Sequence, residues 1–133
     1  LYNIITCKNN VDLMLSEKYF YNPFKLTQHM TETFYEAAHL GNGNGKHVLS
    51  SIVGRYMNSN ISHGLGSINN DILIIGGKHQ PNIEETIKEY QETNPIVEAS
   101  VLENSRFLPH VETPGMFLSE VRPFLDNIEN IEE

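Results

Sequence analysis

The chain has 133 residues, of which 39% are hydrophobic and 20% charged, which is typical of a folded globular protein rather than a disordered one. Seventeen acidic residues stand against nine basic ones, and this net charge of −8 argues against binding to nucleic acid or to an anionic membrane surface. A single cysteine, Cys7, excludes an internal disulfide and a multi-cysteine zinc site, and no apolar run reaches the roughly 18 residues of a membrane-spanning helix.

The first part of the chain is predicted to be helical. Apolar residues recur every three or four positions over 11–19, and Asn10 stands where it could cap the start of that helix. A second stripe runs over 30–40 and meets the glycine-rich segment 41–45, which is predicted to end it. A third stripe runs over 46–58. We therefore expect three helices joined by turns.

The pattern changes at residue 71. The continuous apolar run 71–77 ends in two glycines and predicts a strand buried on both faces. Asn82, followed three positions later by Glu85, predicts a capping box at the start of a helix. Asn94 and Pro95 are predicted to end that helix.

A second strand and a last helix complete the pattern. Residues 96–102 are predicted to form the strand, and Thr113 and Pro114 to open the final helix as its N-cap and first-turn proline. The apolar residues of 117–125 share one face of this helix. Pro123 lies inside it, where a proline is expected to produce a kink.

This order of elements predicts an α/β fold with a parallel β-α-β crossover and helices covering the sheet. Two strands alone make a marginal sheet, so further strands are expected from an upstream segment, a partner or a second copy. The chain also opens on an apolar stretch beginning at Leu1, from which we expect it to be a segment of a longer protein.

Three stretches of the sequence resemble the carboxyl-terminal half of the α/β-hydrolase family. The run from Asp71 to Pro81 is similar to the end of the family's penultimate strand. The run from Val101 to Pro114 is similar to the loop after its last strand, and Phe117 to Leu125 matches its closing helix. The helices before residue 70 look like the family's helical cap.

The resemblance implies a helical cap segment at 1–69 and the C-terminal β-α-β-α segment of the hydrolase core at 70–133. It implies hydrolysis of a small-molecule ester, amide or similar bond, with the N-terminal half of the fold or a second copy completing the sheet. We expect no cofactor and no metal, no nucleic-acid or membrane partner, and a soluble, cytoplasmic protein.

The sequence does not supply a complete catalytic triad. The family's serine lies in Gly-x-Ser-x-Gly, which is absent here; Ser67 lacks that spacing and more simply belongs to a turn. Alignment on the family pattern places Gln80 at the position of the acid and Phe107 at the position of the histidine, so neither can do the expected chemistry. His110, three residues later, could act as general base only in a rebuilt loop. Gln80 and Phe107 are therefore predicted to contact substrate.

Alternatives remain open on the sequence alone. Gln80 and Phe107 support a non-catalytic binding or interaction module as the rival of a hydrolase, and unpaired strand edges allow an oligomer as a third possibility. His79 is interpreted as a solvated loop residue and Glu112 as a partner of a helix dipole. The aromatic residues of 19–24 either line a substrate pocket or pack between helices.

Overall fold

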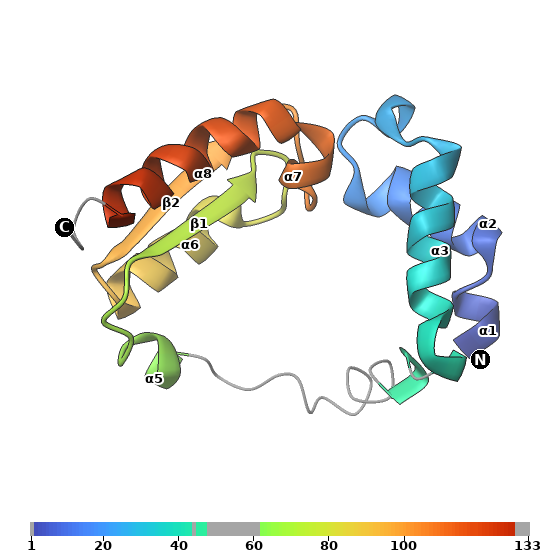
Figure 1. The fold of residues 1–133 in the computed structure, drawn as a ribbon, viewed down its shortest axis with the longest axis horizontal. Helices are drawn as coiled ribbons and strands as arrows, with labels where there is room; N and C mark the ends of the chain where they lie inside the picture. The colour runs from blue at the N-terminus through green and yellow to red at the C-terminus, as the bar shows by residue number, and fades with distance from the viewer. Residues whose placement is uncertain (1, 44, 48–61, 130–133) are drawn as a thin grey trace. The chain divides into compact units, whose positions relative to one another are not determined.

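The structure, a computed structural model, describes residues 2–43, 45–47 and 62–129. The chain divides into two compact units, Leu1–Asn60 and Ile61–Glu133 (Figure 1). Within the described ranges, no helix combines the length and the apolar character needed to cross a bilayer.

The described part of the first unit consists of helices and helical turns joined by short connections, as predicted. Its elements are the helices α1 (Tyr2–Ile5) and α2 (Lys8–Met14), a π-helical turn η1 (Leu15–Tyr19), a 3-10 turn η2 (Pro23–Lys25) and the long helix α3 (Gln28–Gly43). Helix α3 includes Gly41, which has a positive φ of 68°, and Gly43. The predicted end of the second helix in the glycine-rich segment stays a prediction, because residue 44 lies outside the described residues. The third predicted helix lies mostly outside the described residues.

The start of α2 differs from the prediction. Asn10 lies inside the helix, and Cys7 is the N-cap, with an extended backbone whose carbonyl accepts from the N–H groups of Asn10 and Val11, at 3.0 Å each. The Asn10 side chain instead donates to the Ile4 carbonyl at 2.7 Å. The predicted cap is wrong because the chain turns three residues earlier, between α1 and α2.

The aromatic segment after α2 contributes one residue to the core. Phe20 is buried beside Leu15, and its N–H donates to the Leu15 carbonyl at 2.9 Å, which closes the π-helical turn. Tyr19 and Tyr21 are exposed, and Phe24 is 96% exposed. Core packing therefore explains Phe20 alone among these aromatic residues.

The second unit is built around a parallel pair of strands. Its elements are α5 (Ser62–Leu65), β1 (Ile72–Gly77), α6 (Ile83–Thr93), β2 (Val97–Leu102), the short helix α7 (Pro109–Glu112) and α8 (Pro114–Glu129). The register runs from Ile72 beside Val97 to Gly77 beside Leu102. Helices α6 and α8 cover opposite faces of the pair (Figure 1), which confirms the predicted β-α-β crossover.

Alternate residues of β1 face the two covering helices. Leu73 and Ile75 line a shallow apolar cavity with residues of α8, so Ile72, Ile74 and Gly76 face α6. At Gly76 an added methyl group would overlap the Ile83 side chain of α6. The absence of a side chain there lets α6 approach the strand closely.

The ends of α6 are set by two asparagines. Asn82 has a left-handed backbone, with φ 58°, and its side chain makes no cap hydrogen bond, so the predicted capping box is wrong. Asn94 ends the helix as predicted. Its buried amide donates to the carbonyls of Leu65 and Ile68, at 2.9 Å each, and accepts from the Ile96 N–H at 3.1 Å. These three bonds join α5 and the loop after it to the turn before β2.

Helix α8 begins at Pro114, as predicted, and continues past Pro123 to Glu129. The side chain of Thr113 does not cap it, because its hydroxyl donates back to the Pro109 carbonyl at 3.0 Å. The kink at Pro123 stays a prediction.

Substitution of Gly77 tests how closely β1 approaches the loop after β2. A methyl group at Gly77 would overlap the backbone of Arg106, which cannot move as a flexible side chain could. We expect Gly77→Ala to lower the free energy of unfolding by about 1–3 kcal/mol. The control is Gly115→Ala in α8, where the methyl group meets nothing within 4 Å and helix propensity predicts a gain of up to about 1 kcal/mol. Urea unfolding of both variants measures the difference, and equal stabilities would contradict the close approach.

Candidate functional site

The loops that follow β1 and β2 meet at the carboxyl edge of the parallel pair. The Lys78 N–H donates to the Leu102 carbonyl at 2.9 Å, and the His79 N–H donates to the Ser105 carbonyl at 3.0 Å. The turn after β2 reverses at Asn104, which has a positive φ of 57°. Ligand sites of parallel α/β sheets lie at this edge, so the two loops together form the candidate site.

Gln80 lies in the first of these loops and is half-buried. Its backbone N–H donates to the Gly77 carbonyl at 3.0 Å, which closes the turn after β1. Its side chain lines a shallow, mainly polar cavity of about 390 Å³. The lining also includes Lys78 and Glu84, whose side chains form an ion pair at 2.6 Å. The cavity therefore offers an uncharged amide beside this ion pair and a further carboxylate, that of Glu85.

That ion pair has electrostatic consequences for both partners. The hydrogen bond and charge of Glu84 raise the pKa of the Lys78 ammonium, and the hydrogen bond and charge of Lys78 lower the pKa of the Glu84 carboxyl. Both groups therefore keep their charges over a wider pH range. The pair is exposed, so it shapes the rim of the cavity more than it stabilises the fold.

Phe107 lies in the loop after β2 with its ring 40% exposed. The guanidinium carbon of Arg106 lies 5.7 Å from the centre of that ring, within the range of a cation–π contact. An aromatic ring at the position that resemblance assigns to a catalytic histidine can pack against a ligand but cannot transfer a proton. The predicted contact with substrate stays a prediction.

His110 lies on α7 and is exposed to solvent. Its ring contacts the Phe117 ring of α8 edge-on, with 5.9 Å between centres. Within the described residues, no hydrogen bond joins His110 to a serine or a carboxylate. This histidine is held by an apolar contact and lacks the carboxylate that would orient a general base.

A serine and a carboxylate do lie near this edge, but both form hydrogen bonds to nearby backbone groups. Ser105 is fully buried, and its hydroxyl donates to the Leu102 carbonyl at 3.0 Å. Glu112 is only 3% exposed, and its carboxylate accepts from the Arg106 N–H at 2.8 Å. The sequence interpretation of Glu112 as a helix-dipole partner missed this bond. The only sequence signal for it is an acid in the short helix that Pro109 opens after the loop.

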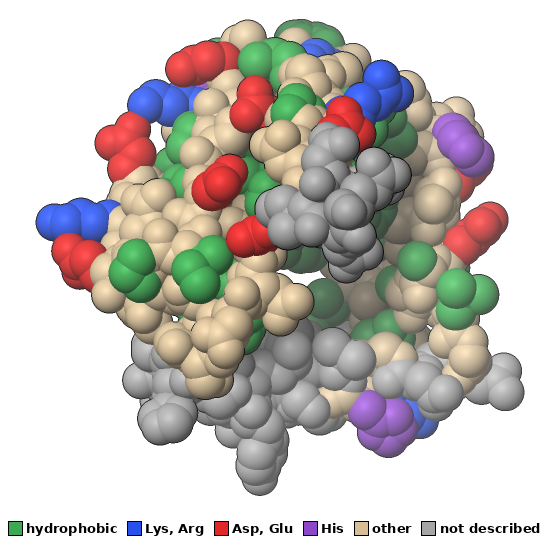
Figure 2. All heavy atoms as spheres, turned by 60° about the vertical axis from the view of Figure 1, so that its left-hand side comes forward, with side chains coloured by type: hydrophobic (Ala, Val, Ile, Leu, Met, Phe, Trp, Pro, Cys, Tyr) green, Lys and Arg blue, Asp and Glu red, His purple; other side chains and the backbone are tan. Residues whose placement is uncertain are grey.

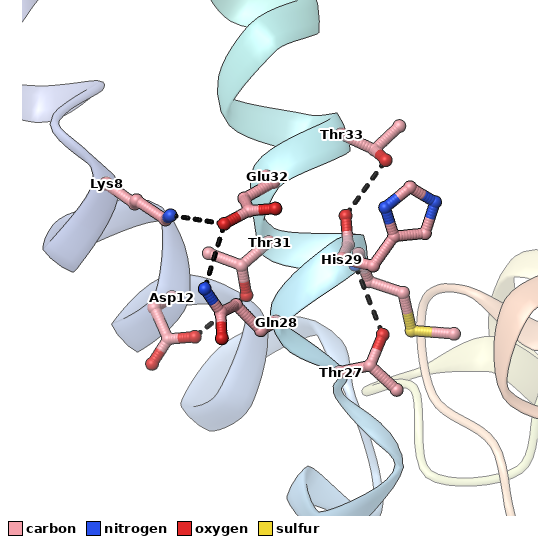
Figure 3. Close-up of polar contacts among 9 residues, drawn as sticks. Lys8, Asp12, Thr27, Gln28, His29, Thr31, Glu32 and Thr33 are labelled. Carbon is pink, nitrogen blue, oxygen red and sulfur yellow. Dashed lines mark hydrogen bonds and ion pairs between the residues drawn. The ribbon is translucent and has the colours of Figure 1, made fainter.

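A second polar cluster joins α2 to α3 in the first unit (Figure 3). The Glu32 carboxylate accepts from the Lys8 ammonium at 2.7 Å and from the Gln28 amide at 2.9 Å. The buried Thr31 hydroxyl donates to the Asp12 carboxylate at 2.8 Å. These bonds pair each of the groups with another side chain, so the cluster acts as a contact between helices.

The described parts of the chain bring together no group of three His, Cys, Asp or Glu side chains that could hold a metal ion.

Comparison with known proteins gives no match to a family model, to a curated protein or to a solved structure. The likeness to α/β-hydrolases therefore rests on the sequence motifs alone.

Substitution of Glu112 tests its structural role. We expect Glu112→Ala to lower the free energy of unfolding by about 1–3 kcal/mol, because the part-buried Arg106 N–H loses its acceptor. Glu112→Gln keeps an acceptor oxygen and should lower the free energy of unfolding by less than Glu112→Ala does. Amide hydrogen exchange at Arg106 provides the direct measurement, with faster exchange expected in the alanine variant. Exchange rates equal to those of the unmodified chain would show that the bond does not hold the loop.

Substitution of Lys8 tests the cluster in the first unit. The hydrogen bond from Lys8, aided by that from Gln28, lowers the pKa of the Glu32 carboxyl. A depressed pKa means that the stabilisation is present above the ordinary carboxyl pKa and is lost as the pH falls through the lowered value. We expect Lys8→Met to raise the Glu32 pKa towards its ordinary value in an NMR titration. The Glu84 carboxyl, paired with Lys78 in the other unit, should titrate unchanged.

Proposed function

We propose that the second unit is the carboxyl-terminal β-α-β-α part of a hydrolase-like α/β protein, and that its loops bind a small molecule without cleaving it. The ligand class follows the resemblance: a molecule with an ester, amide or similar polar group. One observation supports binding without cleavage: the buried side chains of Ser105 and Glu112 form hydrogen bonds to backbone groups in and around the loop after β2.

The chemistry of the edge supports binding. An amide at Gln80 can donate and accept hydrogen bonds, as recognition of an ester or amide carbonyl requires. The exposed Phe107 offers apolar contact in the loop after β2. Cleavage would need a nucleophile, a base and an acid in mutual contact. Among the described residues at this edge, no hydrogen bond joins His110 to a serine or a carboxylate, and Ser105 and Glu112 bind backbone groups of the loop.

A second candidate function is favoured by the exposure of His110. Its ring is accessible at the carboxyl edge, where a general base of this fold family would act. If further strands supplied a serine and a carboxylate within hydrogen-bonding distance, the chain would contribute the base of a hydrolase. This candidate differs from the first in needing a nucleophile and an acid from outside the described residues, and in predicting that removal of His110 abolishes turnover.

Cleavage and binding are tested separately on the 133-residue chain. We expect release of nitrophenol from 4-nitrophenyl acetate at the rate of the buffer, and the same rate for His110→Ala. His29→Ala, which removes a histidine from the first unit, is the matched control. Turnover above the buffer rate that disappears only in His110→Ala would establish the hydrolase in place of the binding module.

Binding is followed by NMR with ethyl butanoate as the probe. We expect chemical-shift changes in the loops at residues 78–82 and 103–110 that saturate at millimolar ester. Gln80→Ala should weaken the binding by about tenfold, the usual cost of one hydrogen bond to a bound ligand. Saturable shifts elsewhere, or none in these loops, would contradict the proposal.

A further inference from the structure

The exposed aromatic residues of the first unit lie in one short stretch, residues 18–25, which we call the aromatic segment. Phe20 is buried in the core, whereas Tyr19, Tyr21 and Phe24 are exposed. Phe24, at 96%, has the largest exposed fraction of the described large hydrophobic residues. None of the three lines the cavity at Gln80 or the cavity beside β1. Their exposure is therefore explained neither by the core nor by the candidate site.

A hydrogen-bonded turn holds Phe24 in its exposed position. The Asn22 side chain accepts from the Phe24 N–H at 3.0 Å, and the Asn22 carbonyl accepts from the Lys25 N–H at 3.1 Å. Pro23 restricts the backbone at the start of this 3-10 turn. The buried Phe20 attaches the other end of the segment to the core. Because the backbone is pre-organised, a contact through Phe24 costs little conformational entropy.

The charges within the aromatic segment are basic. They are Lys18 and Lys25, and both side chains are exposed. The nearest acids in the sequence are Glu17, one position before the segment, and Glu32, whose carboxylate binds Lys8. Lysine and tyrosine both have an apolar body and a polar end, so they can place the body against lipid and keep the end in water. Segments that lie at a membrane surface combine such residues with exposed apolar rings.

The negative charge that argues against an anionic membrane belongs to the second unit. Residues 1–60 contain five Lys and Arg residues against four Asp and Glu residues, whereas residues 61–133 contain four against thirteen. Acidic side chains are spread over the face drawn in Figure 2. Exposed charges are screened beyond about 8 Å at physiological salt, so the charges nearest a bound surface have the largest effect. In the aromatic segment those charges suit an anionic surface.

We propose that the aromatic segment binds the surface of a bilayer that contains anionic lipids. Phe24 enters the boundary between headgroups and acyl chains, the two tyrosines lie at the level of the headgroups, and the two lysines contact lipid phosphates. A lipid surface is favoured over a pocket in a partner protein, because it accepts three rings and two lysines without a matching shape. One short anchor gives weak, reversible binding. This inference concerns the first unit and does not depend on ligand binding at the loops of the second.

Sedimentation with lipid vesicles tests the proposal on the 133-residue chain. The probe is vesicles of phosphatidylcholine with about a quarter of phosphatidylglycerol, which supplies the negative charge. We expect binding at millimolar lipid, weaker binding to phosphatidylcholine alone, and release as the salt concentration rises. A spin-labelled lipid should broaden the NMR signals of residues 18–25 and leave those of residues 62–129 unchanged.

Substitutions of exposed side chains separate the ring from the charges. Phe24→Ala should weaken binding to the anionic vesicles by about tenfold, whereas Leu40→Ala, which removes an exposed apolar side chain from α3, should leave it unchanged. Lys18→Gln and Lys25→Gln should each weaken binding by about fivefold. The control for charge is Lys88→Gln in α6, which should not weaken it. Circular dichroism confirms that each variant is folded.

Four results would overturn the proposal. One is the absence of sedimentation with anionic vesicles, which would leave a pocket in a partner protein as the occupant. Another is equal binding of the Phe24 and Leu40 variants. The third is a change in the NMR shifts of residues 62–129 in Phe24→Ala without lipid, which would assign the ring to the second unit. The last is a dimer, by light scattering, that Phe24→Ala abolishes, which would assign the segment to a second copy.

Discussion

Parallel pairing of β1 with β2 is the constraint on which the second unit depends. Parallel strands need a crossover, and α6 supplies it across one face of the pair. The pairing also requires close approaches, because the helix and the loop after β2 lie against the two glycines that end β1. Asn94 then holds the turn into β2 by bonding to the segment after α5. Each of these contacts can form only when the two strands lie side by side.

The same pairing creates the candidate site and limits its chemistry. It brings the loops after the two strands together and joins them through His79 and Ser105. The buried hydroxyl of Ser105 and the carboxylate of Glu112 satisfy backbone groups of the loop, which would otherwise be costly to bury. Groups held in this way are unsuited to attack on a substrate. Phe107 and His110 are exposed at the same edge, and Gln80 is half-buried there.

The two units differ in the interactions that stabilise each of them internally. The first joins α2 to α3 largely through polar side-chain pairs such as Lys8 with Glu32 and Asp12 with Thr31, beside a small core at Leu15 and Phe20. The second buries apolar strands under two helices and leaves one edge of β1 apolar and unpaired by a strand in the described part. An unpaired apolar edge is a liability for a protein in water unless something covers it.

The sequence by itself determined the two strands and the two long helices of the second unit, because periodicity and helix-ending residues act locally, whereas the short helices α5 and α7 were not predicted. The β-branched run at Ile72–Ile75, the stop at Asn94 and the start at Pro114 were all predictable for that reason. Tertiary structure decided the roles of polar side chains. Asn10, Asn82 and Glu112 each had a plausible local role. Asn10 and Glu112 instead bond to backbone groups that turns bring near them, and Asn82 adopts a left-handed backbone without a side-chain cap. The positions of Gln80, Phe107 and His110 along the chain could be read from motifs. Only the fold showed that Ser105 and Glu112 bind backbone groups of the loop, since hydrogen bonds between a side chain and a loop backbone leave no periodic signal in the sequence.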